Sequence, residues 1–138
     1  MKSGIIASNF DVLHPGYIQM LKEAKQVCDF LLLALHVDPS LENTEKLKPV
    51  LSVIDRIEML NSIKFIDEII EYNTEKDLHN LIVDKVPTVR ILEDDYRKRT
   101  DYTGYGLCPE VYFVDRSHGW STTKYKKLIA DSLKEAKQ

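Results

Sequence analysis

One short segment, Phe30 to Leu35, is apolar at every position and constrains the fold more than any other part of the sequence. It is too short to cross a bilayer as a helix. It also lacks the alternation of apolar and polar residues that marks a strand with one solvated face. A continuous apolar run of this kind is typical of a central strand in a parallel sheet, where helices cover both faces.

The remaining chain alternates candidate strands with candidate helices. Short apolar runs predict further strands at 4–8, 66–70, 89–92 and 111–114. Helical spacing and capping residues predict helices at about 16–27, from Ser52 through Ile63, at 75–83, and from Ser121 or Thr122 to about 135. Segments 37–50 and 93–107 are expected to be loops. This alternation predicts one domain, residues 1–138, with an α/β fold: a Rossmann-like, doubly wound parallel sheet with helices on both faces.

The bulk composition narrows the function classes. The chain is 43% hydrophobic and 30% charged, as expected of a globular protein. A formal net charge of -3 argues against a nucleic-acid partner or a membrane-binding surface. Cys28 and Cys108 match no metal-ligand spacing and are expected to be reduced thiols. No apolar run reaches membrane-spanning length and no signal-peptide pattern is present, so a cytoplasmic location is expected.

The first candidate site lies between the first predicted strand and the first predicted helix, in residues 8–17, which read SNFDVLHPGY. The free N–H groups at the start of that helix favour an anion. Gly16 lets the backbone approach a ligand closely, and His14 can donate to a phosphate oxygen. The alternative is that Asp11 and His14 merely cap the turn.

A second candidate anion site lies between the last strand and the last helix, in residues 116–124, which read RSHGWSTTK. The Arg116 guanidinium and the hydroxyls of Ser121 and Thr122 could converge on one phosphate. An ordinary helix cap beside a solvated arginine is the alternative. Two such sites at the carboxyl edge of one sheet indicate phosphoryl or nucleotidyl transfer by positioning and electrostatics. The chain contains neither GxxxxGK[ST] nor GxGxxG, so these phosphate-binding motifs are excluded.

With these two motifs at this separation, the sequence resembles the cytidylyltransferase family of nucleotidyltransferases over nearly its whole length. The family patterns read GTFDxLHxGH near the N-terminus and RTxGxSTT near the C-terminus. The resemblance implies transfer from a nucleoside triphosphate, CTP first, to a small phosphorylated alcohol such as glycerol 3-phosphate, with release of pyrophosphate. It also implies Mg²⁺ carried by the nucleotide rather than by a protein metal site, and a homodimer.

The resemblance further implies roles for individual residues. His14 and Arg116 should contact the phosphates, and Lys48 or Lys46 should neutralise their charge. The alignment of the loop does not distinguish these two lysines. Further nucleotide contacts are implied at the strand-one turn, beside the base and at the last helix: Ser8, Asn9, Phe10, Gly16, Asp94, Ser121 and Thr122. Asp11 and Arg56 match family positions on the substrate side.

Three departures from the family pattern bear on turnover and base choice. Tyr17 replaces the second histidine of HxGH; a phenol can donate to a phosphate but stays neutral at about pH 7. Ser8 and Asn9 replace Gly-Thr, and Glu93 replaces the glycine of a GDD segment. Three hypotheses about function therefore stay open: a cytidylyltransferase, an enzyme of the same family that uses ATP or another phospho-acceptor, and a weakened relative that binds a nucleotide.

Overall fold

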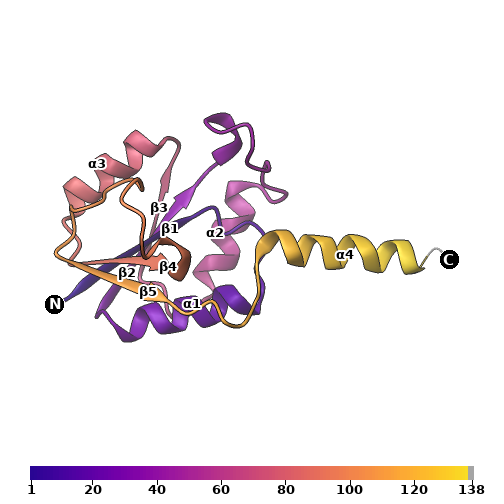
Figure 1. Ribbon diagram of the computed structural model, residues 1–138, viewed down its shortest axis with the longest axis horizontal. Coiled ribbons are helices and arrows are strands. Elements are labelled where there is room, and N and C mark those ends of the chain that lie inside the picture. The colour runs from indigo at the N-terminus through magenta and orange to yellow at the C-terminus, as the bar shows by residue number, and fades with distance from the viewer. Residues whose placement is uncertain (137–138) are drawn as a thin grey trace.

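A five-stranded parallel sheet with strand order β3-β2-β1-β4-β5 forms the centre of the computed structural model, which describes residues 1–136 (Figure 1). Its strands are β1 (Ser3–Ser8), β2 (Phe30–His36), β3 (Glu68–Tyr72), β4 (Val89–Glu93) and β5 (Glu110–Val114). Every neighbouring pair is parallel. The predicted α/β fold with a doubly wound, Rossmann-like sheet is confirmed.

Helices connect the strands and cover both faces of the sheet. They are α1 (Pro15–Gln26), α2 (Val53–Asn61), α3 (Glu75–Lys85) and α4 (Thr122–Ala136), with 3-10 turns η1 (Pro39–Leu41) and η2 (Asp94–Tyr96) in the two predicted loops. Leu31, Leu33 and Leu35 of β2 pack in the core under α1 and α2, whereas Leu32 and Ala34 pack in the core under α3. Figure 1 shows α1 and α3 on opposite sides of the sheet. The apolar run therefore is a central strand buried on both faces, as its sequence indicates.

Two predicted boundaries moved for identifiable reasons. The helix that begins after Ser52 ends at Asn61, because the N–H groups of Ser62 and Ile63 close the last turn instead of continuing it. The third strand was predicted at 66–70 but spans Glu68–Tyr72. The Ile66 N–H still bonds to the Ile63 carbonyl in a turn, and pairing with β2 starts at Glu68 opposite Leu32.

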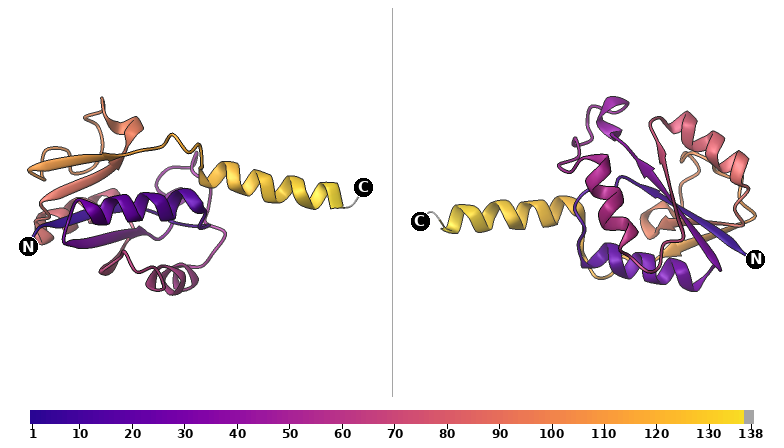
Figure 2. Two further views of the ribbon diagram at one scale, coloured as in Figure 1. Left: turned by 90° about the horizontal axis from the view of Figure 1, so that it is seen from below. Right: turned by 180° about the vertical axis from the view of Figure 1, so that it is seen from behind.

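Helix α4 projects away from the sheet, as both ribbon figures show (Figure 2). None of its described residues is buried, and Leu128, Ile129 and Leu133 are exposed apolar side chains on it. A Lys126–Asp11 ion pair of 2.7 Å ties the base of α4 to the turn after β1. Among residues 1–136, no helix has the length and apolarity needed to cross a membrane.

Candidate active site

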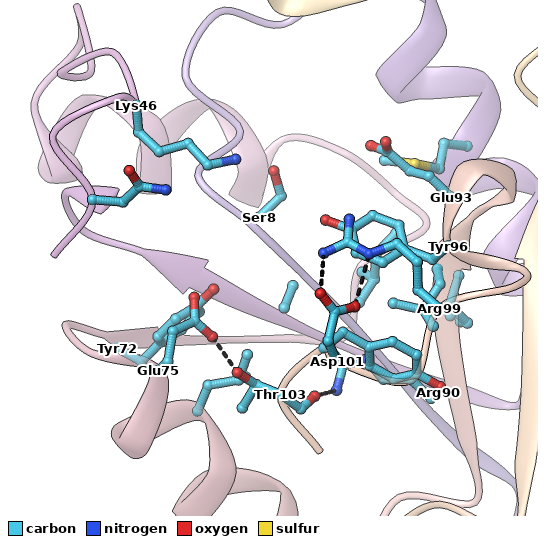
Figure 3. Close-up of a pocket in the computed structure, with 18 residues that line it drawn as sticks. Ser8, Lys46, Tyr72, Glu75, Arg90, Glu93, Tyr96, Arg99, Asp101 and Thr103 are labelled. Atoms are coloured by element: carbon cyan, nitrogen blue, oxygen red, sulfur yellow. Dashed lines mark hydrogen bonds and ion pairs between the residues drawn. The ribbon is translucent and has the colours of Figure 1, made fainter. Parts of the chain in front are cut away.

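Two adjoining cavities open at the carboxyl ends of β1 and β4, where the strand order reverses direction. The first, here called the His14 cavity, has a volume of about 280 Å³ and lies between the start of α1 and the segment 115–123. The second, here called the Arg90 cavity, has about 570 Å³ and lies between β4, the start of α3 and the segment 96–103 (Figure 3). Met20, Lys46 and Glu93 line both. This edge of a doubly wound sheet is where such folds bind ligands.

His14 caps helix α1 and lines the His14 cavity as a buried, neutral imidazole. Its Nδ1 accepts a hydrogen bond from the Tyr17 N–H at 3.3 Å, so in the neutral ring the proton sits on Nε2. Burial lowers the pKa of His14, and the nearby His118 and Arg116 lower it further. The ring therefore offers an N–H donor to a ligand without carrying a permanent charge.

The turn between β1 and α1 holds a strained residue and a tightly packed glycine. Phe10 has φ of 44°, a left-handed conformation that is uncommon for an aromatic residue, while its side chain is buried. A Cβ on Gly16 would lie 2.6 Å from the Cβ of Trp120 and 2.8 Å from His118 Cε1. Gly16 thus allows the two anion motifs, residues 8–17 and 116–124, to approach each other. This close packing is the reason for a glycine at that position.

Tyr17 bonds within the chain rather than projecting free into the cavity. The Thr122 hydroxyl donates to its oxygen at 2.7 Å, and its ring stacks on His14 with centroids 4.3 Å apart. Burial raises the pKa of Tyr17 against the opposing effect of its bonds with Thr122 and Ser8, so the phenol stays protonated at about pH 7. The predicted phosphate-contacting residues Tyr17 and Thr122 are brought together, but they bond to each other.

Arg116 lines the His14 cavity and pairs with Glu93, a residue that lines both cavities. Its Nη1 forms an ion pair with Glu93 of β4, and its Nη2 donates to the Trp120 carbonyl at 3.2 Å. Ser121 caps α4 by accepting the Lys124 N–H at 3.1 Å. Arg116, Ser121 and Thr122 all line the His14 cavity, as predicted for a shared phosphate site.

The loop between β2 and α2 delivers one of its two candidate lysines to the site. Lys46 lines both cavities, whereas Lys48 lines neither. Ser8 at the end of β1 lines the Arg90 cavity. Asn9 lines an adjoining hollow of about 470 Å³ that also contains Lys46. Of the two candidate lysines, the structure therefore places Lys46 at the cavities and Lys48 away from them.

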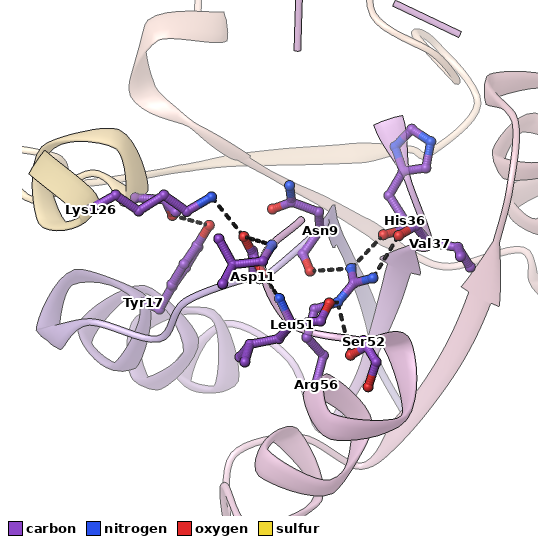
Figure 4. Close-up of polar contacts among 11 residues, drawn as sticks. Asn9, Asp11, Tyr17, His36, Val37, Leu51, Ser52, Arg56 and Lys126 are labelled. Atoms are coloured by element: carbon purple, nitrogen blue, oxygen red, sulfur yellow. Dashed lines mark hydrogen bonds and ion pairs between the residues drawn. The ribbon is translucent and has the colours of Figure 1, made fainter. Parts of the chain in front are cut away.

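Asp11 and Arg56 bond to groups of the chain itself (Figure 4). The Asp11 carboxylate is fully buried and accepts from the N–H groups of Val50 and Leu51, at 2.8 and 2.9 Å, and from Lys126. Burial opposes its ionisation, but these three bonds outweigh burial and lower the pKa of Asp11. We predicted a substrate contact for Asp11; the structure shows it holding the loop and α4 in place.

Arg56 is likewise buried, and its guanidinium donates to backbone carbonyls just after β1, at the end of β2 and just before α2. The accepting carbonyls are those of Asn9, His36, Val37, Leu51 and Ser52, at 2.6 to 3.4 Å. Its predicted role was a substrate contact, whereas these bonds give it a role in fixing the loops around the site.

Asp94 is exposed and paired with Arg97 at 2.7 Å, and it lines neither cavity.

A family model described as cytidylyltransferase-like matches residues 5–128. The chain belongs to the cytidylyltransferase-like family. It is 34% identical over 131 residues to glycerol-3-phosphate cytidylyltransferase of Bacillus subtilis (strain 168), with 94% of this chain and 98% of that protein aligned. It is 29% identical to the bifunctional protein HldE of Campylobacter concisus, and it spans 29% of HldE while 99% of this chain is aligned. Membership makes this cytidylyltransferase-like chain an enzyme of the nucleotidyltransferase class.

Solved structures support the fold of this cytidylyltransferase-like chain. The lipopolysaccharide core biosynthesis protein from Thermoplasma volcanium GSS1 superposes with a TM-score of 0.68 at 22% identity, over 83% of this chain and 97% of that one. Pantoate-beta-alanine ligase from Francisella tularensis superposes with a TM-score of 0.56 at 16% identity, over 99% of this chain and 72% of that one. At these identities the likeness concerns the fold alone.

Other residues of this cytidylyltransferase-like site have no role among those listed from the family resemblance. His118 and Trp120, both within residues 116–124, line the His14 cavity, and Trp120 stacks on His14 with centroids 5.9 Å apart. Lys126 was not predicted as the partner of Asp11, since the two are far apart in sequence. Arg90 carried a usable signal, because a charged residue inside a run that reads as a buried strand is unusual.

Proposed function

We propose that this enzyme joins a nucleoside triphosphate, CTP in the first place, to the phosphate of a small phosphorylated alcohol such as glycerol 3-phosphate, and releases pyrophosphate. One observation carries the proposal: the two anion motifs from opposite ends of the chain line one cavity. The cavity is lined by His14 and the start of α1, by Arg116 and the start of α4, and by Lys46. The name of the 34% identical relative supports CTP and glycerol 3-phosphate as the first pair to test.

In the proposed reaction an oxygen of the acceptor phosphate attacks the α-phosphorus of the nucleotide. A phosphorus–oxygen bond forms as the bond to the bridging oxygen breaks and pyrophosphate leaves with its electron pair. Negative charge builds on the oxygens around the α-phosphorus and on the leaving group. The Nε2–H of His14 donates to these oxygens, while Lys46 and Arg116 offset the charge. No side chain needs to act as a base, since the attacking phosphate is already an anion.

To offset charge on the nucleotide phosphates, Arg116 must give up its ion pair with Glu93. In the structure its Nη1 bonds to Glu93, the residue that replaces the family glycine. An incoming triphosphate competes with this carboxylate for the guanidinium, which weakens nucleotide binding. The Glu93–Arg116 pair is the observation that favours the second candidate function, a slow or inactive nucleotide-binding relative.

Mg²⁺ belongs to this proposal as a partner of the nucleotide. Within residues 1–136, no group of three or more acidic, histidine or cysteine side chains could enclose a metal ion. Mg²⁺ commonly binds through substrate phosphates and waters with few protein ligands, so the residues present fit a nucleotide-borne ion. When bound, it would supply further charge neutralisation at the phosphates.

The homodimer and the cytoplasmic location also stay proposals. The exposed apolar side chains of Leu128, Ile129 and Leu133 on the projecting α4 are consistent with a second copy covering that helix. Light scattering on the purified protein would give the mass directly.

A pyrophosphate-release assay with CTP or ATP and a panel of phosphorylated alcohols tests the proposed function. We expect release that requires both a nucleotide and an acceptor, with CTP preferred. Nucleotide binding without release for any acceptor would overturn the enzyme proposal in favour of the binding relative. Release with ATP in preference to CTP would replace the donor while leaving the reaction class intact.

A further inference from the structure

Arg90 places a guanidinium in the interior of β4, directly beside the candidate active site. Arg90 is 5% exposed, and its backbone pairs with Ile5 of the neighbouring β1. The side chain lines the Arg90 cavity, which Tyr72, Tyr102 and Thr103 also line. Figure 3 labels Arg90, Tyr72 and Thr103 in this cavity. Arginine is rarely this buried without a partner, so the groups that bond to the Arg90 side chain must be identified.

Among the described residues, the hydrogen bonds of Arg90 leave the Nε and Nη2 of its guanidinium without partners. Within residues 1–136, its side chain makes one hydrogen bond, from Nη1 to the Thr103 carbonyl at 2.6 Å. Its Nε is buried and has no partner. The Tyr102 ring lies 5.5 Å from the guanidinium carbon and covers one face. Nη2 is not enclosed as Nε is and has no hydrogen-bond partner among these residues, so it is the guanidinium nitrogen open to a carboxylate or phosphate.

No carboxylate of the described residues forms an ion pair with Arg90, and Glu75 acts on it only at longer range. Residues 1–136 place no carboxylate within 4.0 Å of it. Glu75 lines the same cavity, but its Oε2 accepts from the Thr103 hydroxyl at 2.6 Å. Asp101 pairs with Arg99 at 2.8 Å. Burial raises the pKa values of Tyr72, Tyr102 and Cys108, which keeps all three neutral.

A buried positive charge without a counter-charge is costly, and the cavity in front of it is large enough for a ligand. The cavity of about 570 Å³ adjoins the His14 cavity through Lys46 and Glu93. A molecule whose phosphate reacts beside His14 can therefore extend its other end toward Arg90. The hydroxyl of Ser8 and the carboxylate of Glu75 also line the Arg90 cavity, and such groups suit a hydroxylated chain.

We propose that the acceptor carries a second oxyanionic group, at the end away from the reacting phosphate, and that the Arg90 guanidinium binds this group, with Nη2 as the donor open to the cavity. This inference rests on the proposed nucleotidyl transfer and narrows its acceptor to phosphorylated polyols that also bear an acid group. Glycerol 3-phosphate bound in this way would leave Arg90 without a counter-charge. It would act as a poor acceptor beside its acidic counterpart.

Matched probes that differ only at the far end test the proposal. A six-carbon set consists of glucitol 6-phosphate, 6-phosphogluconate and glucitol 1,6-bisphosphate, and a three-carbon pair consists of glycerol 3-phosphate and 3-phosphoglycerate. Thermal melting of the full chain measures binding, and pyrophosphate release measures the acceptor KM. At one chain length at least, we expect the acid-bearing probe to bind about tenfold or more tightly than its alcohol. The carboxylate and bisphosphate arms show which oxyanion Arg90 prefers.

Arg90→Met keeps the length of the side chain and removes its charge, while Arg90→Lys keeps a charge but not the planar guanidinium. We expect Arg90→Met to abolish the preference for acid-bearing probes, to leave the nucleotide KM unchanged, and to melt no lower than the wild type without ligand. Arg90→Lys should keep part of the preference. Equal binding of acid and alcohol probes by the wild type would overturn the proposal. So would an Arg90→Met protein that melts lower or loses both probe classes alike, because this indicates a structural role.

The two proposals fail in different ways. If no acceptor supports pyrophosphate release, the proposed reaction fails, while the melting shifts still report whether Arg90 selects acid-bearing probes. If release occurs with acceptors that lack a second acid group at least as well as with those that have one, the reaction stands and the inference about Arg90 is wrong.

Discussion

The hydroxyl of Thr122 donates to the hydroxyl of Tyr17 at 2.7 Å, across 105 residues of sequence. This bond joins the first turn of α1 to the first turn of α4. It therefore couples the two anion motifs through the one residue of the first motif that departs from HxGH. Tyr17 holds the site together in this structure, and its ring also supports the face of His14.

Removing the Tyr17 hydroxyl should cost stability more than chemistry. Tyr17→Phe keeps the ring stacked on His14 and loses one hydrogen bond, so we expect the free energy of unfolding to fall by about 1 kcal/mol. Thr122→Val should cost about the same. Because both changes break the same bond, urea unfolding of the double variant should show far less than the sum. Fully additive losses would mean that the two hydroxyls do not depend on each other.

The two loop lysines should differ sharply in their effect on activity. Lys46→Met removes a cation from both cavities, and we expect pyrophosphate release to fall by on the order of 10²-fold. Lys48→Met is the matched control, two positions along the same exposed loop, and should stay within a few-fold of the wild type. The opposite order of effects would show that the loop closes over a nucleotide in a different register.

The fold was predictable to the extent that it depends on local patterns. The apolar run at Phe30–Leu35 and the strand–helix alternation required a parallel sheet between helices. Lys46 and Lys48 could not be distinguished, because a loop without periodicity gives no indication of which side chain faces inward. The Asp11–Lys126 and Tyr17–Thr122 contacts join distant positions, and one sequence contains no record of such pairs. Arg90 could be noticed as a charge inside a strand, but its missing partner is visible only once the neighbours are placed.

Breaking the Asp11–Lys126 pair should destabilise the fold and detach the base of α4. Asp11 is fully buried, so Lys126→Met leaves an uncompensated carboxylate, and we expect a loss of about 3 kcal/mol in urea unfolding. Lys127→Met, on the exposed neighbouring position, is the control and should be neutral. Because the pKa of Asp11 is lowered from 3.8, the stability from its ionised form is present above that pH. It is lost as the pH falls through the lower pKa of the folded state, and a wild type indifferent to acid below pH 3.8 would contradict this.

His14 should make stability depend on pH in a higher range. Its pKa in the folded state lies below the usual 6.5 because burial disfavours the imidazolium. The unfolded chain therefore takes up the proton more readily, and stability that is complete above 6.5 declines as the pH falls below it. Urea unfolding at about pH 7.5 and about pH 5.5 should show a smaller decline for His14→Asn, which retains a capping oxygen. His79→Gln, on the exposed face of α3, should decline as the wild type does.

The most direct test of the account is pyrophosphate release by the wild type and by His14→Asn, with CTP and the best acceptor of the panel. We expect release that requires both substrates. In His14→Asn we expect a loss on the order of 10²–10³-fold, because the Nε2–H donor is gone while the helix cap is kept. A His14→Asn protein that is folded and releases pyrophosphate at the wild-type rate would contradict the account.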